Sequence, residues 1–154
     1  MIDLKQKLMI EQLDSKLKKF EILLKNPVPK KGWVQAIRKA YKMSLRQFGE
    51  RLHITAPSAE GIEKREKEGT ITLRSLEDAG RALNMKLVYG FVPIDGSIEN
   101  TIKNRAKEVA LDIVKTTSNT MVLEDQKNTN ERLKKAVEDK TKQLVYEMPR
   151  YLWD

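Results

Sequence analysis

The sequence predicts a mainly α-helical protein with a single short β-strand. Apolar residues recur every three or four positions through most of the chain, which is typical of amphipathic helices. Ser44, Thr55 and Thr72 stand just before three of these periodic segments, where they can act as N-caps. Asn84 stands where a left-handed residue would end the last of these helices. Only residues 86–93, Lys-Leu-Val-Tyr-Gly-Phe-Val-Pro, combine the β-branched and aromatic residues of a strand.

Composition excludes several classes of chemistry. The 154 residues suffice for one domain, or for one small domain with helical arms. The chain has no Cys and one His, which excludes disulfide scaffolds, zinc fingers, Cys nucleophiles and His-rich metal sites. We therefore expect a protein that is not an enzyme, with no catalytic residues, no metal and no cofactor.

The chain shows no targeting or membrane signal. No apolar run approaches the roughly 20 residues that a membrane span needs. The N-terminus alternates charged and apolar residues and lacks the apolar core of a signal peptide. We expect a cytoplasmic protein without a membrane partner.

Positive charge is concentrated in the middle of the chain. The formal net charge is +8, and residues 26–92 hold 13 basic against 7 acidic residues, whereas residues 93–154 hold 11 of each. This distribution favours a local polyanion-binding face, and the alternative is a solvated basic surface.

Two breaks divide the chain before the middle segment and after it. Residues 1–25 predict an amphipathic helix, and residues 26–32, Asn-Pro-Val-Pro-Lys-Lys-Gly, predict a linker because prolines break helices. Residues 33–93 predict a helical domain that ends in the strand. Residues 94–154 predict two helices, at about 98–117 and 129–148, that bind a partner or dimerise.

The predicted strand needs a partner because a lone strand leaves its N–H and C=O groups unpaired. It can pair with the same strand of a second subunit, which would make a two-fold homodimer. The alternative is pairing with an extended part of the loop near residues 70–72.

Residues 44–65 have the layout of a DNA-binding helix-turn-helix. Ser44 can cap the first helix with Gln47 as its capping-box partner, and Thr55 can cap the second. Small Gly49 allows the helices to approach closely, and His53 occupies the turn. The segment resembles the lambda-repressor-like (XRE) family, whose turn usually reads Leu-Gly-Val. The resemblance implies a lambda-repressor-like helix-turn-helix bundle, and it implies that Glu63 anchors the recognition helix.

In this motif the second helix enters the major groove while the first crosses the backbone. Mapped onto this chain, the positions that face the groove are Ala56, Pro57, Ser58, Glu60, Gly61 and Lys64. The expected phosphate contacts are Ser44, Arg46, Gln47, Lys64, Arg65 and Lys67. Arg and Lys usually read guanine, and Asn and Gln read adenine, so this set of base-reading side chains is thin. A helix-turn-helix-shaped bundle that binds only protein is therefore the alternative.

A closer resemblance extends over nearly the whole chain. Residues 31–33, 61–73, 82–93 and 121–126, with Gln12-Leu13-Asp14 and Leu152-Trp153, look like the family called mobile mystery protein A. The resemblance implies a regulator carried on mobile elements beside a Fic-domain protein. It further implies an antitoxin of that Fic-type toxin that represses its own operon. The charge-balanced residues 94–154 would then bind the protein partner.

Some Fic proteins are inhibited by a helix bearing Ser/Thr-x-x-x-Glu-Gly/Asn, whose Glu pairs with an active-site Arg. Thr120 and Glu124 match the first part of this motif, while Asp125 stands where Gly or Asn is expected. The alternative is that residues 123–125 are a structural joint between helices. The competing function for the whole chain is a stand-alone XRE-type regulator of transcription whose C-terminal helices only dimerise.

Overall fold

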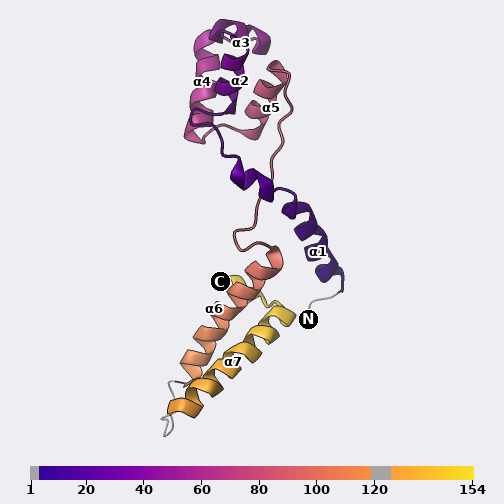
Figure 1. Cartoon of the computed structure of the whole chain (residues 1–154), viewed down its shortest axis with the longest axis vertical. Coiled ribbons are helices and arrows are strands. Elements are labelled where there is room, and N and C mark those ends of the chain that lie inside the picture. Colours follow the sequence, from indigo (N-terminus) through magenta and orange to yellow (C-terminus); the bar gives the residue numbers. More distant parts are fainter. Residues whose placement is uncertain (1–3, 119–125) are drawn as a thin grey trace. The chain divides into compact units, whose positions relative to one another are not determined.

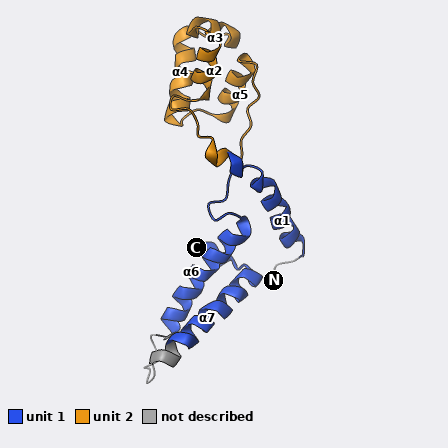
Figure 2. Ribbon diagram, in the orientation of Figure 1, with its two compact units in different colours: residues 1–22, 91–154 blue, residues 23–90 orange. Residues whose placement is uncertain are grey.

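The computed structural model describes residues 4–118 and 126–154, which are mainly helical (Figure 1). The chain forms two compact units, Leu23–Gly90 and a second made of Met1–Ile22 with Phe91–Asp154 (Figure 2). The helices of the first unit are α2 (Trp33–Ala40), α3 (Leu45–Leu52), α4 (Ala56–Glu68) and α5 (Leu73–Ala82). Those of the second are α1 (Leu4–Lys18), α6 (Ile98–Ser118), α7 (Gln126–Glu147) and the 3-10 helix η2 (Arg150–Trp153).

Local sequence signals set the ends of the helices in the unit Leu23–Gly90. Ser44 and Gln47 form the predicted capping box of α3, with the Gln47 N–H donating to Ser44 Oγ at 3.1 Å. Thr55 and Thr72 accept from the third backbone N–H of α4 and α5 in the same way. Asn84 follows α5 in the left-handed conformation, with φ of 56°. These predicted caps are confirmed.

The core of this unit gathers the apolar face of each of its helices. Phe48, Ala59, Ala79 and Leu83 are fully buried, and Val34 and Ile62 nearly so. α4 continues past Arg65, where the predicted motif ends, to Glu68. It ends there because Gly69 adopts the left-handed conformation.

The predicted β-strand at residues 86–93 is wrong. Among residues 4–118 and 126–154 no strand is present, and the segment after α5 has neither helical nor strand structure. The loop that could have paired with it is occupied, because the N–H groups of Thr70 and Ile71 donate to the Arg65 carbonyl. Val88, Tyr89 and Phe91 are consequently exposed. Strand propensity alone does not make a strand when no neighbouring backbone completes its hydrogen bonds.

The N-terminal helix is shorter than predicted, and it lies in the same compact unit as the C-terminal helices. α1 ends at Lys18, and a 3-10 helix, η1, occupies Glu21–Lys25. The carboxylate of Asp14 accepts from the backbone N–H groups of Ile98 and Glu99, at 2.7 and 3.3 Å. α1 thus supplies an anion to the otherwise unpaired donors at the start of α6.

The α6–α7 hairpin is closed by the C-terminus of the sequence. Ala106 and Ala110 are fully buried on α6, where small side chains let α7 approach closely. Leu152 of η2 is fully buried in the same cluster as Leu144. The guanidinium of Arg105 donates to the Leu152 carbonyl, and to that of Asp154 at 2.6 Å. The last residues are therefore part of the core of this unit.

We expect Leu152→Ala to lower the free energy of unfolding of this unit by about 2–5 kcal/mol, the usual cost of truncating a buried Leu. Urea denaturation followed by circular dichroism would measure the loss. Trp153→Ala is the matched control, because the Trp153 side chain is half exposed. Equal stability of the two variants would show that the terminal turn adds nothing to the core.

Candidate nucleic-acid interface

The two helices α3 and α4 meet at a tight turn that brings the predicted DNA-binding residues together. His53 adopts the left-handed conformation in this turn, with φ of 58° and ψ of 39°. A Cβ atom on Gly49 would lie 2.7 Å from the carbonyl oxygen of Ile54. α3 therefore packs directly against the backbone of the turn, at the position where Gly49 has no side chain.

A buried ion pair fixes α4 to α2. Arg38 and Glu63 are 8% and 5% exposed. The Arg38 guanidinium donates through Nε and Nη2 to the two carboxylate oxygens of Glu63. Its Nη1 donates to the Met43 carbonyl at 2.8 Å, and Gln35 adds a further donor to Glu63 at 3.2 Å. Each nitrogen of the guanidinium and both carboxylate oxygens have a hydrogen-bond partner, which is the condition under which buried charges are tolerated.

A second carboxylate, one turn further along α4, caps α2. Glu66 accepts from the backbone N–H groups of Trp33 and Val34, at 2.9 and 2.8 Å. Gly32 precedes α2 with φ of 92°, and a Cβ atom there would lie 2.6 Å from Glu66 Oε1. Gly32 thus leaves room for the carboxylate that serves as the N-cap of α2.

Sequence reasoning missed Glu66. The one local signal was indirect: Lys-Lys-Gly precedes α2 where a Ser, Thr, Asp or Asn would normally stand, so the cap has to come from elsewhere.

The opposite side of α4 carries the predicted groove-facing residues. Ala59, Ile62 and Glu63 face the core of the unit. The exposed positions are Pro57, Ser58, Glu60, Lys64, Arg65 and Lys67, and Ala56 and Gly61 are half-buried. The structure thus places the predicted base-reading set on one accessible helix.

The Arg65 side chain lies beside Gly61 on α4. A Cβ atom on Gly61 would lie 3.1 Å from Arg65 Nη1, so the guanidinium extends over the space that the glycine leaves open.

The predicted contacts on α3 are accessible, and their side chains already have partners. Ser44 and Gln47 are engaged with each other in the capping box. Arg46 pairs with Glu50 at 2.7 Å, with both side chains more than half exposed. An exposed pair of this kind contributes at most about 1 kcal/mol, so a phosphate can compete for Arg46.

The accessible surface of this unit carries a net positive charge. Leu23–Gly90 holds 14 basic and 7 acidic residues. The two buried charges, Arg38 and Glu63, cancel, so the whole excess lies on the accessible surface. The remaining surface therefore favours a polyanion.

Thr120 and Glu124 lie outside the described residues. In the described part of the chain no group of three or more His, Asp or Glu residues is placed to hold a metal ion. No described helix is long and apolar enough to cross a membrane. The chain matches no family model, no curated protein and no solved structure.

Replacing the buried carboxylate should unfold the unit that carries α4. Glu63→Gln leaves the Arg38 charge buried without a counter-charge, and loss of one partner from such a pair costs about 3–5 kcal/mol. Thermal or urea denaturation would measure the difference from the unchanged chain.

Glu60→Gln is the matched control, because Glu60 is exposed on the same helix. A change within about 0.5 kcal/mol is expected there. Similar stabilities for the Glu63 and Glu60 variants would contradict the anchoring role of the buried pair.

Proposed function

We propose that the protein is a sequence-specific DNA-binding regulator of transcription, with α4 as the recognition helix. The observation that carries this proposal is the presentation of α4. Two carboxylates hold one side of the helix to α2, and the other side exposes small residues and cations. A helix with small residues at its centre can approach base pairs closely in a major groove.

The contacts divide by chemistry. Ser58, Glu60 and Lys64 are the polar groups available to base edges, and the Ala56 methyl can touch a thymine methyl. Phosphate contacts come from Ser44, Arg46 and Gln47 at the start of α3 and from Lys64, Arg65 and Lys67 on α4. Phosphate contacts hold the register, and base contacts supply the specificity.

The resemblance to the mobile mystery protein A family extends the proposal. The protein acts in the cytoplasm as the antitoxin of a Fic-type toxin and represses its own operon as a homodimer on two half-sites. The balanced charge of residues 93–154 supports a protein partner there rather than DNA. The alternative is a stand-alone regulator whose C-terminal helices only dimerise. An adjacent reading frame with a Fic motif would favour the antitoxin over the stand-alone regulator.

Removing a phosphate contact should weaken the salt dependence of DNA binding. The probe is duplex DNA from the region upstream of the protein's own reading frame, measured by fluorescence anisotropy over a range of salt concentrations. Lys64→Ala and Arg65→Ala should each reduce the slope of log affinity against log salt by about 0.9. Lys135→Ala, an exposed lysine of α7, should leave the slope unchanged. Identical slopes for all variants would exclude α4 from the interface.

The exposed segment after α5 offers backbone and apolar side chains to a second copy. Light scattering at micromolar concentration should give twice the chain mass of 17.8 kDa. Tyr89→Ser should shift the protein toward monomer, because it removes exposed apolar surface from this segment. A monomer in the unchanged protein, with and without DNA, would contradict the homodimer.

A further inference from the structure

A long groove runs along one flank of the α6–α7 hairpin. It consists of two adjoining cavities of about 780 and 360 Å³ that share Lys107. α1, α6 and α7 line the larger cavity, and α6 and α7 line the smaller one. All of it belongs to the unit Met1–Ile22 with Phe91–Asp154.

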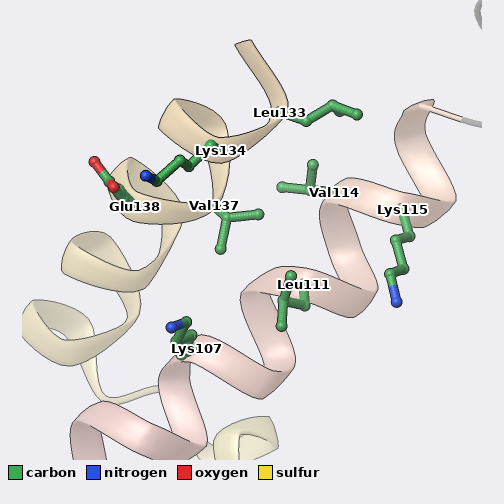
Figure 3. Close-up of a pocket in the computed structure, with 8 residues that line it drawn as sticks. All are labelled: Lys107, Leu111, Val114, Lys115, Leu133, Lys134, Val137 and Glu138. Atoms are coloured by element: carbon green, nitrogen blue, oxygen red, sulfur yellow. The ribbon is translucent and has the colours of Figure 1, made fainter. Parts of the chain in front are cut away.

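The floor of the groove is apolar. Leu111 and Val114 of α6 and Leu133 and Val137 of α7 line the smaller cavity, and Figure 3 shows Val114 and Val137 pointing toward one another across it. Ile10, Ile102 and Val145 continue this floor into the larger cavity. Leu111 is 37% exposed, so the apolar surface is open to a partner.

The rim of the groove is rich in lysine. It carries three acidic residues, Glu11, Glu99 and Glu138, one of which pairs with Lys103 at 3.0 Å. The six lysines on it are Lys7, Lys103, Lys107, Lys115, Lys134 and Lys142. Lys7 and Glu11 belong to α1, and the other five lysines and two glutamates belong to residues 93–154, whose total charge is balanced.

The length of the groove matches a helix. Its lining residues on α6 extend from Glu99 to Lys115, which is about 24 Å at a rise of about 1.5 Å per residue. An amphipathic helix of about 16 residues has this length and lays its apolar face into such grooves.

We propose that this groove binds an amphipathic helix of a protein partner, with an apolar stripe flanked by Asp and Glu residues. The stripe covers the Leu111–Val137 floor, and the acidic flanks pair with Lys107, Lys134 and Lys142. Duplex DNA has no apolar surface to cover this floor. This docking helix would belong to the protein partner proposed above, and the inference rests on that proposed function.

The test uses the full chain and two fluorescein-labelled helical peptides of 16 residues. Both have Leu at positions spaced by three and four. One has Glu and the other Lys on both flanks of the stripe. Fluorescence anisotropy should show saturable binding of the Glu peptide only. Reversing two rim charges, Lys107→Glu with Lys142→Glu, should weaken that binding by about tenfold or more. The same variant should gain affinity for the Lys peptide.

Lys135→Glu is the matched control, because Lys135 is exposed on α7 outside the groove. It should leave affinity for the Glu peptide within about twofold, since an isolated surface charge has a small effect. Circular dichroism would establish that all variants are folded.

Three results would overturn the proposal. They are equal binding of the two peptides, equal losses in the rim and control variants, and binding of phosphatidylglycerol vesicles without binding of the Glu peptide. Binding to upstream DNA is measured in parallel and should not change with the rim variant. If the unchanged protein bound the Glu peptide but not the upstream DNA, only the proposed DNA-binding role would be rejected.

Discussion

The ion pair between Arg38 and Glu63 is the constraint on which the arrangement of the α2–α5 unit depends. Both charges are almost completely removed from water, so each is stable only while the other is in place. Their hydrogen bonds also include Gln35 and the Met43 carbonyl. Because Glu66 caps α2 from the same side of α4, two successive turns of that helix are fixed to one neighbour. α4 is thereby held with its other side exposed.

This anchoring also separates charge within α4. The helix carries four carboxylates, and the two that bind α2 lie away from the surface on which a polyanion would sit. Lys64, Arg65 and Lys67 stay exposed. The second unit uses charge differently, because its lysines surround an apolar groove rather than a helix with small residues. We therefore propose different partners for the two surfaces, duplex DNA for one and an acidic amphipathic helix for the other.

Sequence reasoning succeeded where the signal is local. The caps Ser44, Thr55 and Thr72 act on residues three positions away, and hydroxyl side chains at these positions mark the start of a helix. It failed where the interaction spans the chain. Asp14 caps a helix that begins 84 residues later, and Glu66 caps one that begins 33 residues earlier. The predicted strand failed for the related reason that a strand exists only with a partner.

We propose that α4 and the start of α3 contact DNA. Nitrogen-15 NMR of the full chain, with and without duplex DNA from its own upstream region, tests it directly. The largest amide shift changes are expected at residues 44–47 and 56–67, with little change along α6 and α7. Shift changes concentrated in α6 and α7, with α4 unaffected, would contradict it.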